Sequence, residues 1–190
     1  MVRQLLIRNL FISGTDGQEL VYINERLKNR QTFCEWDKNL MGPIHDTLGV
    51  EQGGINSDSF YKLINNEQLT ISQNSELGVR MGDIIIYAVG QADDVVLLSN
   101  DISSLYNLLY LTKEYCCKYM VELVDDKSKL QVFLPATLTP FSNFFSSSSC
   151  LTINSKYLKF TNEAEHVGII CSTSSNLTTI LVMIQSQKDA

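Results

Sequence analysis

This 190-residue chain has only two histidines and five cysteines, and the cysteines are not spaced as metal ligands usually are. The histidines lie far apart and have no neighbouring ligand set, so we expect neither to bind a metal. The cysteines are odd in number, and no two form a C-x-x-C spacing. They are Cys34, Cys116, Cys117, Cys150 and Cys171. This pattern excludes a disulfide framework and argues against a zinc site.

Long apolar runs are also absent, because none approaches the roughly 20 residues that a membrane span needs. At the N-terminus, Arg8 and Asn9 interrupt the hydrophobic run too early for a signal peptide. Apolar residues make up 44% of the chain, and the mean hydropathy is −0.01. We therefore expect a soluble protein of the cytoplasm or nucleus, without a membrane partner.

Basic residues are fewer than acidic ones. Fifteen Lys and Arg stand against twenty-one Asp and Glu, which gives a formal net charge of −6. Proteins that grip a nucleic-acid backbone normally carry a basic surface. The charge balance therefore argues against strong binding of nucleic acid by this chain alone.

The most informative stretch of the chain contains two β-branched apolar runs, Ile84–Val89 and Val95–Leu98, around a polar segment ending in Asp93 and Asp94. Runs of this kind predict two buried strands joined as a hairpin. Adjacent carboxylates beside an apolar sheet repel each other unless a bound cation balances their charge. A divalent metal ion with oxygen ligands is the usual cation at such a site. The alternative is that the aspartates only cap a turn, as aspartates commonly do.

Helical spacing predicts two helices near the N-terminus, one carrying Leu5, Leu6, Leu10 and Phe11 and one over Leu20–Leu27. Residues 32–39 predict a strand of a hairpin, followed by the hairpin turn at 37–39. Ser57 and Asp58 offer N-caps for a short helix through Ile64, and residues 65–76 resemble a polar connector.

Downstream of the aspartates, Asn100 and Asp101 cap a predicted helix that runs to about Met120 and has one buried face. Residues 151–160 predict a small hairpin, and 165–170 a strand. Residues 183–190 are expected to begin a further helix.

Two segments resemble sequence boxes of one enzyme family. Gln91-Ala92-Asp93-Asp94 with the apolar residues after it resembles the Tyr-Ala-Asp-Asp box of reverse transcriptases, in the form found in non-LTR (LINE-type) retrotransposons. Residues 48–57, which contain Gln52-Gly53-Gly54, resemble the Gly-Val-x-Gln-Gly box of the same family. The resemblance covers roughly residues 49–170.

The resemblance implies roles for the residues of these boxes. Asp93 takes the position of the first Mg²⁺ ligand and Asp94 that of the second. Gln91 stands where the family has an aromatic residue, whose side chain lies near the primer end and the incoming nucleotide. Gln91 and the adjacent Ala92 are therefore implied to contact the nucleotide or the template. The residues implied to pack against the forming base pair, as a template and nucleotide wall, are Gln52, Gly53 and Gly54.

Two further segments are similar to parts of the same enzymes. Lys127 matches the lysine that is a candidate proton donor to the leaving pyrophosphate, although Val124 and Ser128 replace the usual Asn and Thr. Val167 and Gly168 resemble the paired residues of the primer-grip strand. The implied cofactor is Mg²⁺ or Mn²⁺. The implied partners are an RNA template, a DNA primer, deoxynucleotides and the missing domains of a polyprotein.

The expected fold class is α+β. It is a partial polymerase palm, an antiparallel sheet with helices packed on one face, with the fingers missing and the thumb barely begun. We expect a palm over 1–133, a Ser-rich linker over 134–150, and a primer-grip-like hairpin with the start of a thumb over 151–190. The family's upstream Asp motif is not found, since the surroundings of Asp16 do not match it.

The implied function is therefore that of a reverse transcriptase (RNA-directed DNA polymerase) fragment, inactive alone. One alternative is a non-catalytic α+β remnant that acts as an interaction module. A second alternative is an unrelated metal-dependent hydrolase that uses Asp93 and Asp94. The second is the weaker, because no His or acidic cluster supplies the remaining ligands.

Overall fold

The computed structural model divides the chain into two compact units, Met1–Ile64 and Asn65–Lys188, which are described one at a time. Within the residues it describes, no helix is both long enough and apolar enough to cross a membrane. The described residues are 2–28, 30–46, 48–51, 53–91, 94–133, 151–166, 169–172 and 179–187.

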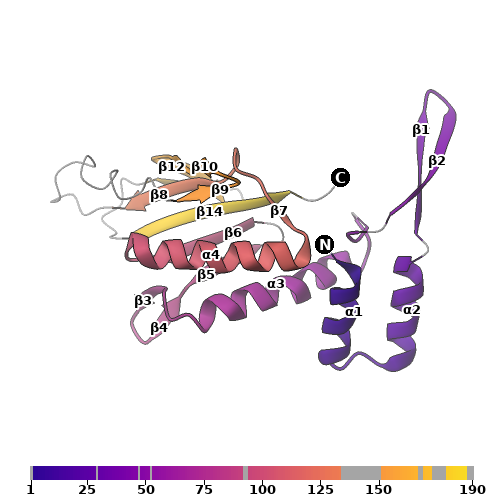
Figure 1. Cartoon of the computed structure of the whole chain (residues 1–190), viewed down its shortest axis with the longest axis horizontal. Coiled ribbons are helices and arrows are strands. Elements are labelled where there is room, and N and C mark those ends of the chain that lie inside the picture. Colours follow the sequence, from indigo (N-terminus) through magenta and orange to yellow (C-terminus); the bar gives the residue numbers. More distant parts are fainter. Residues whose placement is uncertain are drawn as a thin grey trace. The chain divides into compact units, whose positions relative to one another are not determined.

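The first unit contains an α-helical pair and a β-hairpin (Figure 1). Its elements are α1 (Arg3–Ile12), α2 (Gly17–Lys28), β1 (Gln31–Trp36), β2 (Asn39–His45) and the N-terminal part of α3 (Ser57–Gln73). The helices α1 and α2 confirm the two helical patterns predicted near the N-terminus. Leu6 and Leu10 of α1 are buried, whereas Phe11 is mostly exposed.

The β1–β2 hairpin confirms the predicted strand and turn. Asp37 and Lys38 form a two-residue turn with φ values of 47° and 63°, the left-handed conformation that tight hairpin turns require. Every residue of β2 is exposed, and Trp36 of β1 is 78% exposed. This hairpin therefore forms without burying its apolar side chains.

The second unit contains the C-terminal part of α3, a second long helix and the strands that follow α3 in the chain. Its elements are the rest of α3, β3 (Val79–Met81), β4 (Ile84–Ile86), β5 (Ala88–Gln91), β6 (Asp94–Ser99), α4 (Ile102–Tyr119), β7 (Glu122–Leu123), β8 (Lys129–Phe133), β9 (Thr152–Ile153), β10 (Lys156–Tyr157), β11 (Lys159–Phe160), β12 (Glu163–His166), β13 (Ile169–Ser172) and β14 (Thr179–Gln187). Helices and largely antiparallel sheets together make the fold α+β, as the sequence predicts.

Helix α3 is longer than predicted. Residues 65–76 were expected to form a polar connector, which is wrong because the helix continues to Gln73. Gln68 is buried, and its Nε2 donates to Oγ1 of Thr112 in α4 at 3.4 Å. Polar residues that find partners on another helix leave no apolar periodicity in the sequence, so the pattern missed this extension.

The apolar run Ile84–Val89, predicted as one strand, is two strands interrupted at Tyr87. Its first part pairs with β3 across a turn at Gly82–Asp83, and its second part pairs with β6. The run divides because its two halves have different pairing partners, which composition alone does not reveal.

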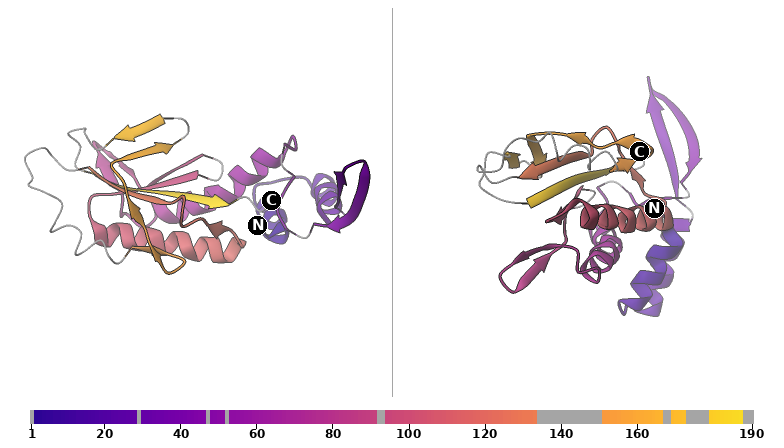
Figure 2. Two further views of the ribbon diagram at one scale, coloured as in Figure 1. Left: turned by 90° about the horizontal axis from the view of Figure 1, so that it is seen from above. Right: turned by 60° about the vertical axis from the view of Figure 1, so that its left-hand side comes forward.

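The main sheet has the strand order β11-β8-β14-β6-β5, with β7 also paired to β14. Helix α4 contacts β6, β7 and β14 and covers one face of this sheet, and α3 lies on the same side (Figures 1 and 2). The two helices of the second unit, α3 and α4, thus lie on one face of the main sheet, as expected. All pairings in the sheet are antiparallel except β11 with β8, which is parallel.

Helix α4 begins where the sequence predicts, and most of its predicted buried face is buried. Asp101 caps its N-terminus by accepting from the backbone N–H of Ser104 at 2.8 Å. Burial raises the pKa of the Cys116 thiol to about 12, whereas the neighbouring Cys117 is exposed. Met120, predicted on the buried face, is 60% exposed because it is the left-handed residue that ends the helix.

The C-terminal segment corrects another expectation. Residues 183–190 were expected to begin a thumb helix, but Thr179–Gln187 form strand β14, which lies between β6 and β8 at the centre of the sheet. Its run Ile180–Ile184 is apolar and contains β-branched residues, which favour a strand that pairs on both edges. Since β14 is antiparallel to both neighbours, β6 and β8 are parallel to each other and α4 connects them. This is a split βαβ arrangement.

Candidate functional site

Asp94 of the Asp-Asp segment lies at one end of the β5–β6 hairpin. Gln91 of β5 pairs with Asp94 of β6, and Gly90 pairs with Val95. Ala92 and Asp93 lie outside the described residues. Asp94 is the first residue of β6 and is half-buried. The hairpin therefore places this carboxylate at the end of the sheet.

Asp94 belongs to a row of residues that crosses three strands. It is opposite Gln91 on β5 and opposite Gln185 on β14. Directly opposite residues of an antiparallel pair are cross-strand neighbours, with Cβ atoms about 4.5–5.5 Å apart. The carboxylate thus stands between two glutamine positions.

Strand alternation puts Asp94 on the same face of β6 as Val96 and Leu98. Val96 packs with Ala164 of β12, and Leu98 and Cys171 of β13 join this cluster. The β12–β13 hairpin therefore lies over the face that carries Asp94, on the opposite side of the sheet from α4 (Figure 2).

A buried glutamine ties that hairpin to the sheet. Gln131 of β8 is fully buried, and its Nε2 donates to the backbone oxygens of Asn162 at 3.1 Å and Cys171 at 2.7 Å. His166 of β12 pairs with Ile169 of β13. The predicted primer-grip residues are Val167 and Gly168. Both lie outside the described residues, but the strands on either side of them are packed on β6 and β8.

The described residues do not provide a complete two-cation centre. Among them, no group of three or more His, Cys, Asp or Glu side chains is close enough to hold a metal ion. Mg²⁺ requires an octahedral set of oxygen ligands, and a two-metal site needs carboxylates shared between ions about 3.5–4 Å apart. Asp94 has amide residues, not carboxylates, at both neighbouring register positions. These residues therefore do not fit a two-cation site.

The glycine segment of the second sequence box lies in the first unit. Gly53 has a φ of +77°, which few other residues adopt. At Gly54, a Cβ atom would come within 2.7 Å of Ser57 Oγ, so a larger residue there would require the Ser57 hydroxyl to move. Gln52 lies outside the described residues. The box therefore forms a tight turn that leads into a helix.

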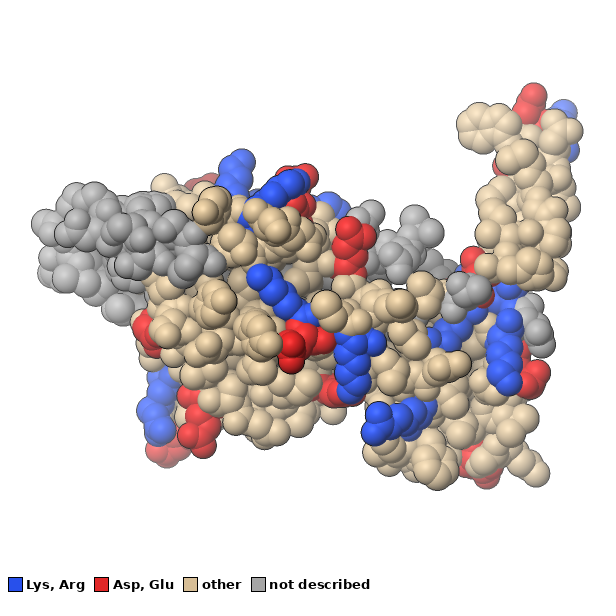
Figure 3. Space-filling view, in the orientation of Figure 1, with Lys and Arg blue, Asp and Glu red and all other residues tan. Residues whose placement is uncertain are grey.

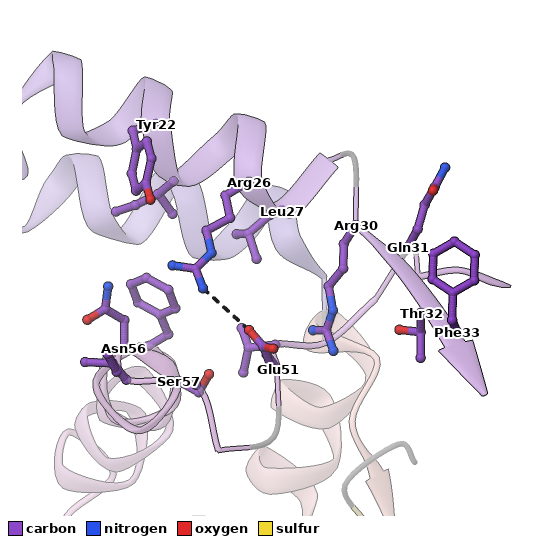
Figure 4. A pocket seen from close by; sticks show the side chains of 15 residues that line it. Tyr22, Arg26, Leu27, Arg30, Gln31, Thr32, Phe33, Glu51, Asn56 and Ser57 are labelled. Atoms are coloured by element: carbon purple, nitrogen blue, oxygen red, sulfur yellow. Dashed lines mark ion pairs between the residues drawn. The ribbon is translucent and has the colours of Figure 1, made fainter. Parts of the chain in front are cut away.

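This loop forms one wall of a cavity of about 500 Å³, which Figure 4 shows from close by. Arg26 of α2 points toward Glu51, with 3.6 Å between Nη2 and Oε2. Arg30 also lines the cavity and pairs with Asp46 at 3.2 Å. The cavity thus combines two guanidinium groups, each already paired with a carboxylate, and three aromatic side chains, Tyr22, Phe33 and Phe60.

Sequence reasoning missed both arginines of the cavity, because they lie outside every recognisable box. It also missed Arg3, which is buried and donates to the backbone oxygens of Leu27 at 2.7 Å and Leu48 at 3.0 Å. Burial, with Arg30 nearby, lowers the pKa of Arg3. This side chain holds the end of α2 and the loop before the glycine turn in place, and no sequence pattern signals such a contact.

Lys127 is exposed in the turn between β7 and β8. The turn is closed by Ser128, whose N–H and Oγ both donate to the backbone oxygen of Val124, at 3.0 and 2.6 Å. Asp125 lies in the same turn. The Nζ of Lys156 in β10 is 2.6 Å from the Asp125 carboxylate, and this contact lowers the pKa of Asp125. Lys127 therefore lies on the surface, and Val124 and Ser128 close the turn that carries it.

Charges on the face drawn in Figure 3 are mixed, with Lys and Arg side chains scattered among Asp and Glu on the described residues. This agrees with the net charge of −6. No family model matches the chain, and no curated protein matches it either.

Proposed function

We propose that this chain is a palm-type module of a non-LTR retrotransposon reverse transcriptase, which contributes a template–primer surface and does not polymerise alone. The observation that carries the proposal is the β5–β6 hairpin. Its two strands are antiparallel, Gln91 is opposite Asp94, and Asp94 is the first residue of a buried strand. Helices α3 and α4 lie on either side of this hairpin in sequence.

Three further arrangements support the proposal. The β12–β13 hairpin, which resembles a primer grip in sequence, packs on the face of the sheet that carries Asp94. The segment with Gly53 and Gly54 makes a tight turn, and Gly54 lines a cavity, which suits a loop that packs against a ligand. Lys127 is exposed and free of a described ion pair, which suits a contact with phosphate.

The test is binding of a labelled RNA template annealed to a DNA primer, followed by fluorescence anisotropy, with duplex DNA of equal length as the comparison. We expect tighter binding of the RNA–DNA hybrid and no primer extension with Mg²⁺ and deoxynucleotides. Lys127→Ala is expected to weaken binding and reduce its salt dependence, whereas Lys159→Ala on β11 is the matched control and leaves both unchanged.

Equal affinity for both duplexes, with no effect of Lys127→Ala, would overturn the proposal. That result would favour the second candidate, a non-catalytic interaction module. The observation that favours this candidate is the exposed apolar surface of the β1–β2 hairpin, where Trp36, Leu40 and Met41 are each more than half exposed.

A further inference from the structure

We infer that the cavity of the first unit binds a small monocarboxylate with an aromatic body, whose carboxylate is held by Arg26 and Arg30. This inference goes beyond the proposed function and does not depend on it. Every residue that lines the cavity belongs to the first unit, whereas Asp94 and Lys127 belong to the second. The argument uses the walls of the cavity, the donors that its arginines offer and the charges around it.

The cavity is formed by three segments of the first unit. The C-terminal part of α2, the start of β1 and the loop that leads into α3 enclose about 500 Å³ (Figure 4). Sites for small molecules usually have volumes of about 300–1,000 Å³, with apolar walls and a few polar groups. The volume therefore suits a small ligand.

The apolar part of the wall contains aromatic rings. Tyr22 of α2 and Phe60 of α3 line the cavity together with Ile23 and Leu27. Tyr22 is 64% exposed, so its ring has surface left to bury against a ligand. Aromatic rings bind a further ring through offset-stacked or edge-to-face contacts. This wall therefore favours a ligand with a planar, apolar body.

The two arginines offer donors to a ligand. The Nη2 of Arg26 lies 3.6 Å from Glu51 Oε2, which is too long for a hydrogen bond, and both side chains are more than half exposed. An exposed ion pair of this kind contributes little to stability, so a better-placed anion can replace Glu51. In Figure 4, Arg26 and Arg30 both point toward the loop that carries Glu51.

Arg30 is the more firmly placed of the two arginines. Its Nε lies 3.2 Å from Asp46 Oδ2, and Thr32 Oγ1 donates to the same carboxylate oxygen at 2.5 Å. Within the described residues, the two terminal nitrogens of Arg30 form no hydrogen bond. A guanidinium group matches a carboxylate with two parallel hydrogen bonds. A ligand carboxylate therefore meets one fixed guanidinium group and a second that can turn toward it from Glu51.

The charges around the cavity favour an anion with a single charge. Five charged side chains line the cavity or are joined to its lining by direct contacts: Arg3, Arg26, Arg30, Asp46 and Glu51. Three guanidinium groups stand against two carboxylates, so one positive charge is not balanced within the set. A monocarboxylate balances it. A phosphate monoester carries a charge of about −1.5 to −2 at pH 7 and would leave an excess of negative charge.

The test is a titration of the isotope-labelled full chain, followed by the NMR shifts of backbone amides and arginine Nε–H groups. The probe is hydrocinnamate, a phenyl ring on a short chain that ends in a carboxylate. Hydrocinnamide is the matched probe without the charge, and phenyl phosphate carries a second charge. We expect hydrocinnamate to shift the signals of cavity residues saturably and hydrocinnamide to bind at least about tenfold more weakly.

Substitutions assign the binding to the arginines. Arg26→Gln should weaken the binding of hydrocinnamate at least about tenfold, because it removes a charge-assisted hydrogen bond. Arg8→Gln is the matched control, since Arg8 is exposed on α1 and does not line the cavity. It should leave the affinity unchanged. Glu51→Gln removes the carboxylate that competes for Arg26 and should tighten binding.

Equal binding of hydrocinnamate and hydrocinnamide would overturn the inference, and so would tighter binding of phenyl phosphate. An unchanged affinity in a folded Arg26→Gln protein has the same meaning. Hydrogen exchange of α2 establishes that each variant is folded. If Arg26→Gln does not fold, Glu51→Gln decides, because an affinity that does not rise would contradict the competition for Arg26.

A free aromatic acid and the C-terminus of a peptide share this chemistry. The tripeptide Gly-Gly-Phe and its C-terminal amide distinguish the two sources. Binding of the free tripeptide more tightly than hydrocinnamate, with loss of binding in the amide, would identify a peptide C-terminus. Binding of hydrocinnamate alone would identify a free acid. Absence of binding by both acids would overturn the inference.

Discussion

Two hairpins of this chain, β1–β2 and β5–β6, are each made of consecutive antiparallel strands but differ in what surrounds them. In β1–β2, Leu40 is 70% exposed and every residue of β2 faces solvent. In β5–β6, Leu97 is fully buried and β6 is paired on both edges. Turn and strand residues therefore suffice to specify a hairpin, but they do not specify a buried one.

What buries the second hairpin is a set of segments remote in sequence. α4 covers one face of β6, the β12–β13 hairpin covers the other, and β14 occupies the edge opposite β5. An isolated two-stranded hairpin is marginally stable in water, and three or more strands with a covered face make one stable. The β1–β2 hairpin forms a two-stranded sheet by itself.

The largest expected effect comes from a proline in the central strand. Val182 of β14 pairs with Leu97 on one side and Leu130 on the other. Val182→Pro removes a backbone donor where a central strand does not accept proline, so we expect the free energy of unfolding to fall by about 3 kcal/mol or more. Urea unfolding measures the loss, and hydrogen exchange should show that β6 loses protection.

Leu40→Pro in β2 is the matched change in the exposed hairpin. Among the described strands β2 pairs with β1 alone, so we expect Leu40→Pro to leave the exchange protection of β6 unchanged. Retained protection of β6 in Val182→Pro would contradict the central role of β14.

A side-chain truncation gives the next largest difference between the hairpins. Leu97→Ala removes a fully buried side chain and should cost roughly 2–5 kcal/mol of unfolding free energy, through lost burial and the cavity it leaves. Leu40→Ala, the same substitution in β2, should stay within about 0.5 kcal/mol. Similar losses in the two variants, measured by urea unfolding, would show that the β1–β2 hairpin is covered in solution.

The smallest effect concerns the helix that follows the buried hairpin. Asp101→Ala removes the cap of α4 and should cost about 1 kcal/mol at pH 7. Hydrogen bonds from Ser104 lower the pKa of Asp101 below its ordinary value of 3.8. The charged form is thus the stabilised one. Its contribution is complete above the ordinary value and is lost as the pH falls through the lowered pKa.

The check is the difference in urea midpoint between Asp101→Ala and the unchanged chain, measured from pH 7 to pH 2. The charge-dependent part of this difference should shrink only at the acid end of the range. Asp101→Asn keeps a capping oxygen without a charge and should show less pH dependence. A difference that declines already near pH 6 would point to another group.

Local elements were predictable wherever apolar spacing and turn chemistry agreed. The turn at Asp37, the helix after Asp101 and the strand that begins at Asp94 all follow from such signals. The extension of α3 past Ile64 was not predictable, because its buried face is partly polar and its partners are on α4. Neither were Arg26 and Arg30, since a cavity is assembled from several segments and no single one of them has a recognisable pattern.

The sequence by itself determined the α+β class, the turn of the β1–β2 hairpin and the position of Asp94 at the start of a strand. These depend on backbone preferences and periodicities of a few residues. Only the tertiary structure decided that residues 179–187 form the central strand and that Gln185 is opposite Asp94. Strand register depends on hydrogen bonds between segments far apart in the chain, and such pairing is not encoded in either segment alone.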